Sequence, residues 1–333
     1  MTTRKRVCVA AFRDGPADVI SNILIVAAAI IVAVIIFRFA FPRQFLRLVL
    51  LATRRIMGLK TRSVEFNGTD WPYLEGGPES GDVLVLLHGF SGDKDNWLLY
   101  ARYLRKDHRV IVPDLPGFGD NARDPDADYH MDAQARWLLA FVDAMGIDKF
   151  HIGGNSMGGY ITLKFTLAYG DRILSLALLD SAGVLGETKS ELQLATEKGE
   201  SLLTVSSPEE FDRLLRFIVY RPLPLPGFIK KPYCEDLVAN RPFLESIFWP
   251  MAEEMQDRPL NDQLQRIAAP ALVIWGRDDR LIDVSCVDVL KAQIPNNHCV
   301  VFEETGHVPM LERPAESAAV HAEFLNNYRA ATL

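Results

Sequence analysis

The sequence predicts an α/β protein with a mostly parallel sheet, helices on both faces, an inserted helical cap and an N-terminal transmembrane helix. Three observations predict this architecture. Short apolar runs alternate with helical patterns between residues 62 and 328, which is typical of parallel sheets covered on both faces. One long interval, 184–268, contains no strand-like run, and the stretch 19–37 contains no charged residue.

The composition is that of a globular protein, with 333 residues of which 49% are hydrophobic and 24% are charged. The net charge of −7 hides an asymmetry, because residues 1–62 hold eleven Lys and Arg against two Asp. This leader carries +9, which leaves −16 for the rest of the chain. A basic leader before an acidic body argues against nucleic acid as a partner and favours a membrane-facing leader. The four Cys form neither a disulfide framework nor a zinc motif.

Residues 19–41 are predicted to be a membrane anchor. As a helix, the uncharged stretch 19–37 would be about 28 Å long, close to the roughly 30 Å hydrocarbon core of a bilayer. A cleaved signal peptide has a shorter apolar region, of about 7–15 residues, and ends in small residues. This stretch instead ends in Phe37-Arg38-Phe39, so we expect a retained single-pass anchor.

The flanks of the anchor are basic. We expect residues 1–18 to form a basic N-terminal segment and 42–61 a basic juxtamembrane linker, in which Arg54 and Arg55 attract anionic lipid. Four basic residues precede the span and five closely follow it. This small bias favours a membrane location with the catalytic domain on the cytoplasmic side.

Strand patterns begin at residue 62. Arg62–Asn67 and Trp71–Leu74 are predicted to form a hairpin, and the apolar run 83–87 is typical of a central parallel strand. Further strand-like runs alternate with helical patterns in the two core parts, 62–183 and 269–333. The runs are 110–112, 150–152, 174–179, 271–275 and 299–302, and the helical patterns are 94–105, 130–145, 157–169, 285–293 and 315–328.

The interval 184–268 is predicted to be a helical cap, with helices at 190–203, 208–219 and 234–256. Within it, the stretch 213–231 carries five basic residues, no acid and many large apolar side chains. This composition favours docking on a bilayer. The alternative is a cap that only covers a soluble pocket.

The chain is organised around Gly153-Gly-Asn-Ser156-Met-Gly-Gly159, which lies between a strand-like run and a helical pattern. Ser between glycines at a strand-to-helix turn matches a nucleophile elbow. The turn would force Ser156 into a strained conformation, and side chains at 154 and 158 would collide with neighbouring backbone. The N–H groups after Ser156 would lie at a helix N-terminus, where developing negative charge is stabilised.

A serine nucleophile needs a base, and the base needs a carboxylate that holds its tautomer. On this fold the partners follow in the order Ser, acid, His, each after a strand. Asp278 and Asp279 follow one strand-like run, and His307 follows the next. Asp180, at the end of an earlier run, is an alternative acid. The backbone N–H groups of Phe90 and Met157 would form the oxyanion hole.

Taken together, these motifs resemble the α/β-hydrolase superfamily over about residues 62–328. The resemblance implies an α/β-hydrolase fold, with Ser156 as nucleophile, His307 as base and Asp279, rather than Asp278, as acid. His88 and Asp114 are expected to be structural, in loops beside the pocket. The motifs that carry the resemblance are His88-Gly-Phe90, Asp114-Leu-Pro-Gly-Phe-Gly119, Gly154-Asn-Ser-Met-Gly158, Trp275-Gly-Arg-Asp-Asp279 and Gly306-His307.

The order of anchor, basic stretch, core and cap is similar to membrane-anchored monoacylglycerol lipases. The resemblance implies a serine hydrolase of lipid esters that works through an acyl-enzyme and needs no metal or cofactor. The expected partners are a lipid ester substrate and the bilayer. A general carboxylesterase, a carbon–carbon bond hydrolase acting on ring-cleavage products and a non-catalytic binding module are the alternatives.

Overall fold

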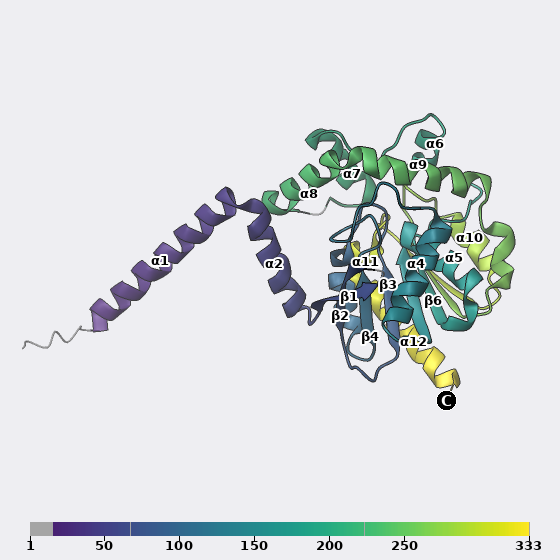
Figure 1. Ribbon diagram of the computed structural model, residues 1–333, viewed down its shortest axis with the longest axis horizontal. Coiled ribbons are helices and arrows are strands. Elements are labelled where there is room, and N and C mark those ends of the chain that lie inside the picture. The colour runs from purple at the N-terminus through teal and green to yellow at the C-terminus, as the bar shows by residue number, and fades with distance from the viewer. Residues whose placement is uncertain (1–15, 67, 223, 333) are drawn as a thin grey trace, which may run out of the picture. The chain divides into compact units, whose positions relative to one another are not determined.

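The structure is a computed structural model that describes residues 16–332, apart from residues 67 and 223 (Figure 1). Most of the predicted basic segment 1–18 therefore lies outside the described residues. Residues up to Val49 form one compact unit, and residues from Leu50 onward form a second.

The first unit is dominated by helix α1 (Pro16–Ala40), which contains the predicted anchor. Its window Ile23–Ala40 has a mean hydropathy of 3.0 and is not buried by protein. Among the described residues this is the one helix long and apolar enough to cross a membrane. Helix α2 (Pro42–Ile56) follows directly, so the predicted linker 42–61 is helical over most of its length. The helices separate before Pro42, because proline disfavours a helical conformation in the residue before it.

The second unit contains an eight-stranded sheet in the order β1-β2-β4-β3-β5-β6-β7-β8 (Figure 1). β1 and β2 form the predicted hairpin, and β2 pairs antiparallel with β4. All other pairs are parallel, which confirms the predicted mostly parallel sheet. The strands are β1 (Lys60–Phe66), β2 (Thr69–Gly76), β3 (Val83–Leu87), β4 (Arg109–Pro113), β5 (Phe150–Asn155), β6 (Ile173–Leu179), β7 (Ala271–Gly276) and β8 (Asn297–Phe302).

Helices cover both faces of the sheet, and the central strand β3 shows why its sequence is apolar throughout. Val85 and Leu87 belong to one buried cluster, while Leu84 and Leu86 belong to the other. Successive side chains of a strand point to opposite faces, so a strand buried on both faces must be continuously apolar. The core helical elements are η1 (Lys94–Trp97), α3 (Leu98–Leu104), α4 (Met131–Ala144), α5 (Met157–Ala168), η2 (Gly170–Arg172), α10 (Cys286–Gln293), α11 (Pro309–Glu312) and α12 (Pro314–Thr332).

The cap lies between β6 and β7 and is helical, as predicted, but two of its helices differ from the prediction. The pattern 190–203 forms a helix only over α6, since Gly199 has a φ of +78°, a conformation that ends helices. The pattern 234–256 is split at Asn240, where Pro242 starts a new helix. The cap elements are α6 (Glu191–Thr196), α7 (Pro208–Ile218), α8 (Gly227–Ala239), α9 (Arg241–Asp257) and η3 (Asn261–Arg266).

The basic stretch 213–231 of the cap is largely neutralised by acids that flank it in the fold. Arg213 pairs with Glu210, Lys230 with Asp212, Lys231 with Glu235 and Arg221 with Glu304. Arg216 has no ion pair among the described residues. The excess of positive charge that the sequence suggests at this surface is therefore mostly balanced.

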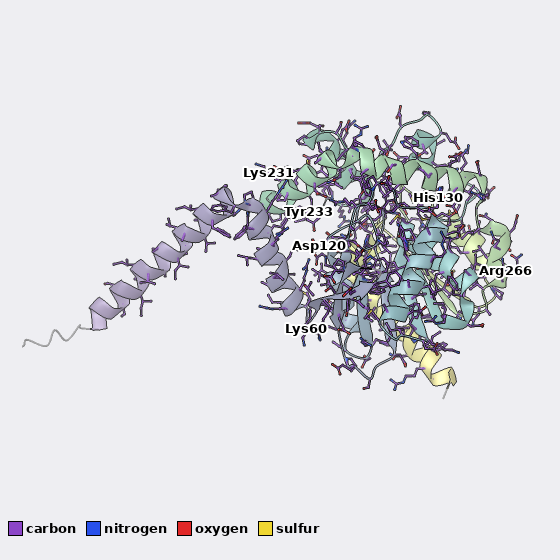
Figure 2. The ribbon with its side chains drawn as sticks, viewed as in Figure 1. Lys60, Asp120, His130, Lys231, Tyr233 and Arg266 are labelled. Atoms are coloured by element: carbon purple, nitrogen blue, oxygen red, sulfur yellow. The ribbon has the colours of Figure 1, made fainter. Side chains whose placement is uncertain are left out.

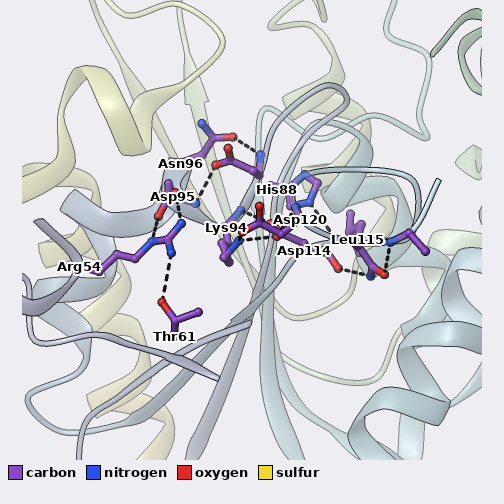
Figure 3. A network of polar contacts seen from close by, with 12 residues as sticks. Arg54, Thr61, His88, Lys94, Asp95, Asn96, Asp114, Leu115 and Asp120 are labelled. Atoms are coloured by element: carbon purple, nitrogen blue, oxygen red, sulfur yellow. Dashed lines mark hydrogen bonds and ion pairs between the residues drawn. The ribbon is translucent and has the colours of Figure 1, made fainter. Parts of the chain in front are cut away.

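Arg54 corrects the prediction that it attracts lipid. Its side chain is buried, and its guanidinium donates two hydrogen bonds to the carboxylate of Asp95, at 2.7 and 2.6 Å (Figure 3). A third bond, of 3.1 Å, goes to the hydroxyl of Thr61. A planar guanidinium matches a carboxylate in this bidentate way. Arg54 therefore holds the end of α2 to η1 within the second unit, whereas Arg55 is exposed.

Candidate active site

Ser156 lies at the sharp turn between β5 and α5, as the elbow motif predicts. Its φ of +55° falls in a region that costs a residue with a side chain about 1–3 kcal/mol. Backbone hydrogen bonds hold the turn in place. The Ser156 N–H donates to the carbonyl of Leu179 at 3.1 Å, and the Ser156 carbonyl accepts from Ala182 and Tyr160 at 3.0 Å each.

The glycines that flank Ser156 allow two backbone segments to approach closely. A Cβ on Gly154 would lie 2.2 Å from the carbonyl oxygen of Gly158. A Cβ on Gly158 would lie 2.3 Å from the carbonyl oxygen of Leu87. Contacts this short are not possible without moving backbone, so the predicted collisions at 154 and 158 are confirmed.

Asp279 and His307 come together from the loops after β7 and β8. The Nδ1–H of His307 donates to Oδ2 of Asp279 at 2.8 Å, and both side chains are buried. Oδ1 of Asp279 accepts two further bonds, from the N–H groups of Leu281 (2.8 Å) and Ile282 (3.1 Å). Asp278, by contrast, is exposed. With Nδ1 donating to Asp279, the lone pair of a neutral His307 is left on Nε2.

The loop after β3 carries Phe90, the first predicted oxyanion donor, and α5 begins with Met157, the second. Among the described residues no protein acceptor takes either N–H. His88 shapes the loop: its Nε2 accepts from the N–H of Leu115 at 2.9 Å, and its Nδ1 donates to the carbonyl of Gly89 at 2.8 Å. Burial lowers the pKa of His88, so its ring is neutral and structural.

Residues 84–320 match the alpha/beta hydrolase family. The chain belongs to this family. The match begins in β3 and includes the elbow and the cap, while the hairpin β1–β2 lies outside it. Relatives named as lipases match over most of the chain. The chain is a carboxylic ester hydrolase.

Three relatives show the kind of hydrolase that this chain resembles. Lipase 1 of Psychrobacter immobilis is 35% identical over 270 residues, which cover 79% of this chain and 81% of the relative. Monoacylglycerol lipase ABHD6 of Homo sapiens is 27% identical over 92% of this chain and 95% of its own. The crystal structure of a protein described as a membrane phospholipase A is 38% identical, has a TM-score of 0.83 and covers 95% of this chain and 99% of that chain.

An apolar pocket lies above Ser156 and beneath the cap of this hydrolase. Its cavity volume is about 70 Å³. Phe90 and Met157 line it beside Ser156, and the cap helix α9 contributes Phe248, Met251 and Met255. These side chains form a mostly apolar wall, which suits a hydrocarbon chain better than a polar substrate.

Two positioning residues of the site were not predicted. Asn155 donates from one amide nitrogen to the carbonyls of Leu179 and His307, at 3.0 Å each, and so ties the histidine loop to the elbow. Glu312 accepts from the N–H groups of Gly306 and Tyr220, at 2.9 and 2.8 Å. Asn155 lies inside the elbow motif, but the motif assigns no role to it. No pattern in the sequence marks Glu312.

Asp114 is held as a structural carboxylate, in line with its prediction. It accepts from the backbone N–H groups of Lys94 and Asp120, at 2.8 Å each, and from the Lys94 ammonium (Figure 3). The same ammonium donates to the carboxylate of Asp120 at 2.7 Å. This network lies under the loop that carries His88. Its groups are thereby occupied in holding that loop.

Proposed function

We propose that this hydrolase cleaves monoacylglycerols or similar lipid esters through an acyl-enzyme on Ser156. The Oγ of Ser156 attacks the ester carbonyl carbon while Nε2 of His307 takes its proton. The oxygen that becomes negative accepts from the N–H groups of Phe90 and Met157. His307 then gives the proton to the leaving alcohol, and it activates a water that releases the acid. Asp279 orients His307 and stabilises its cation.

The apolar pocket is the observation that carries this proposal. It joins the nucleophile directly to a wall of methionine and phenylalanine side chains under the cap. Burial of an acyl chain against this wall is worth about 0.8 kcal/mol per methylene group. A long lipid acyl chain therefore gains binding energy that a short acyl group cannot. A general carboxylesterase would not need this wall.

We further propose that α1 anchors the enzyme as a single membrane-spanning helix with the catalytic unit on the cytoplasmic side. The length and the hydropathy of the window Ile23–Ala40 support the anchor. Because the charges of the stretch 213–231 are mostly paired, cap contact with lipid would depend on exposed apolar side chains such as Tyr220 and Leu225.

A substrate panel on the full-length protein in detergent tests the proposed substrate. The panel holds mono-, di- and triacylglycerols, a phosphatidylcholine, a short p-nitrophenyl ester and a vinylogous diketone acid. We expect monoacylglycerols with long acyl chains to have the highest kcat/KM. Preference for the short ester would support a general carboxylesterase, and preference for the diketone acid would support a carbon–carbon bond hydrolase.

Ser156→Ala is the control for the whole panel. Loss of a catalytic serine of this kind lowers kcat by about 10⁶-fold in comparable enzymes. Undiminished turnover in Ser156→Ala would overturn the acyl-enzyme mechanism. Absence of turnover on every substrate with the wild-type protein would mean that the lipid esters in the panel are not its substrates.

A further inference from the structure

A second buried carboxyl, that of Asp180, lies beside the pair formed by Asp279 and His307. It follows β6, next to the strand that precedes Asp279, and none of its surface is exposed. Side-chain atoms of Asp180, Asp279 and His307 lie within 4.8 Å of one another. Two buried carboxyl groups at this distance cannot both be ionised without a large cost, so one of them must hold a proton.

The hydrogen bonds show which carboxyl is charged. Asp279 accepts from three donors: the ring of His307 and the N–H groups of Leu281 and Ile282. Asp180 accepts from a single donor, the N–H of Gly276, which reaches Oδ1 at 2.8 Å. The Oδ2 of Asp180 is buried and accepts from no donor among the described residues. A carboxylate is stabilised by each donor it accepts from, so the charge belongs on Asp279.

The backbone fixes Asp180 in this place. Its φ is +44°, a left-handed conformation that is unfavourable for a residue with a side chain. Its own N–H donates to the carbonyl of Ile274 in β7 at 3.0 Å. The bond from the Gly276 N–H holds Oδ1, and Oδ2 is buried and left without a donor among the described residues. A strained residue held by two bonds to one strand is well suited to aim a single polar atom.

The charges around Asp180 agree with a bound proton. Burial raises the pKa of Asp180 well above its usual range, and the negative charge of Asp279 raises it further. Glu312, the other acid that faces it, acts in the same direction. The N–H of Gly276 opposes them. His307 faces Asp279 rather than Asp180, since its Nδ1–H is already given to Asp279.

We propose that Asp180 is a neutral carboxylic acid in the working enzyme, and that its Oδ2–H donates a hydrogen bond to the carboxylate of Asp279. Asp180 is then a positioning residue that acts on His307 through Asp279. This inference rests on the proposed function of Asp279 as the acid of the triad. No proton is transferred in this role, because Asp180 keeps its proton throughout the cycle and only shares it.

The hydrogen bond has a consequence for catalysis. A donor on Asp279 spreads the negative charge of this carboxylate and weakens its attraction for the imidazolium form of His307. Removing this donor should therefore strengthen the attraction between Asp279 and a protonated His307.

Asp180→Asn is a close copy of the proposed protonated acid. The amide oxygen can accept from Gly276, and the amide NH₂ can donate to Asp279 in place of Oδ2–H. Asp180→Ala keeps neither bond. If Asp180 is neutral, the apparent pKa of the acidic limb of the kcat/KM–pH profile should be the same in Asp180→Asn as in the wild type, within about 0.2. Asp180→Ala raises the apparent pKa of this limb by about half a unit or more.

The opposite pattern would overturn the proposal. An ionised Asp180 loses a full charge in Asp180→Asn, which would shift the limb of that variant to lower pH. A structural role alone would lower kcat in Asp180→Ala without moving the limb. Thermal denaturation of both variants shows whether each is folded, and Asp180→Asn remains informative if Asp180→Ala is not.

Infrared difference spectroscopy tests the proton without any turnover. A protonated buried carboxyl has a C=O stretch separate from that of carboxylates, and we expect such a band in the wild-type protein at neutral pH. The difference between the wild-type and Asp180→Asn spectra should contain this band, and Ser156→Ala should keep it. A spectrum that is identical in wild type and Asp180→Asn would reject the neutral acid. The activity of Ser156→Ala tests the proposed acyl-enzyme mechanism alone. Failure of that mechanism can therefore be distinguished from failure of the neutral Asp180.

Discussion

Asp279 and Asp278 are adjacent in sequence, but only Asp279 is buried and accepts from His307. We expect Asp279→Asn to lower kcat by about 10⁴-fold, because an amide at this place favours the wrong tautomer of the histidine. Asp278→Asn, a matched change at an exposed carboxylate, should change kcat by less than about twofold. Steady-state rates on one ester measure both, and a larger loss in Asp278→Asn would reassign the acid.

Gly158 gives a second prediction at the scale of a residue. An added Cβ would meet the carbonyl oxygen of Leu87 at 2.3 Å, so the elbow or β3 must move in Gly158→Ala. We expect a loss of about 1–3 kcal/mol or more in the free energy of unfolding, and most of the activity with it. Gly170→Ala is the control, because its Cβ would meet nothing within 4 Å. Urea unfolding measures the stability of both variants. Equal stabilities would contradict the close approach of Gly158 to the Leu87 carbonyl.

The site residues differ in how readily the sequence reveals them. Ser156 was predictable because its turn needs glycines at fixed positions, and His307 because it follows a strand after the acid. The role of Asn155 depends on a carbonyl 152 residues away. The second carboxyl, Asp180, was predicted as an alternative acid, but its protonation depends on how many donors the fold brings to each carboxyl. Local patterns carry neither kind of information.

Within the catalytic unit, a buried ion pair between Arg54 and Asp95 holds the end of α2 to η1. Arg54→Met leaves Asp95 with its charge but without its partner. Breaking a buried pair in this way costs about 3–5 kcal/mol, which should appear as a lower free energy of unfolding in urea. Arg55→Met changes the neighbouring exposed residue of the same helix and should cost less than about 0.5 kcal/mol.

Equal stabilities of the two arginine variants would mean that the pair is not formed in solution.

The sequence could not reveal this pair, because Asp95 lies 41 residues from Arg54. Arg in a basic stretch after an apolar span resembles a residue that attracts lipid headgroups. Burial, not charge, distinguishes Arg54 from Arg55, and burial is a property of the folded chain.

Tyr233 of the cap helix α8 is labelled in Figure 2. Its hydroxyl donates to Oδ2 of Asp93 at 2.9 Å and so joins the cap to the core. Burial, and then the charges of Asp95 and Asp114, raise the pKa of Asp93 from 3.8 to about 7, although Lys94 opposes them. Between these two pH values the folded protein holds a proton that the unfolded chain has lost. The free energy of unfolding should therefore fall as pH rises through this window.

Asp93→Asn removes this titration and tests the junction between cap and core. Its free energy of unfolding should lack the decline, of about 1–2 kcal/mol between pH 5 and 7, that the wild type shows. Urea unfolding at several pH values measures both proteins. A wild-type stability that rises through this window would show that Asp93 is charged when the protein is folded.

The cap also marks the limit of helix prediction from periodicity. Apolar spacing runs on through Asn240, so one helix was predicted over 234–256, which joins the second half of α8 to α9 and misses the break at Pro242. The strands were easier, because a strand buried on both faces leaves a short run without polar residues, as β3 does. Periodicity identifies which face is buried, but the end of a helix depends on single residues.

At the scale of the whole molecule, the chain divides near Val49 into an apolar helix and a catalytic unit with its own two-sided core. From charge and hydropathy alone, the sequence predicted an anchor over 19–41, a linker over 42–61 and the start of the core at residue 62. The catalytic unit should therefore keep its fold and its chemistry without α1.

Deletion of residues 1–41 tests this division and leaves α2 with Arg54 in place. We expect the shortened protein to keep kcat on a short p-nitrophenyl ester within about twofold of the full chain, because every site residue lies in the second unit. It should no longer be found in the membrane fraction, since the window Ile23–Ala40 is removed. Deletion of residues 1–15 alone is the control and should leave the protein in the membrane. If the protein without residues 1–41 still sediments with liposomes, the cap or α2 must hold it there, and α1 would not be the anchor that places Ser156 near its lipid substrate.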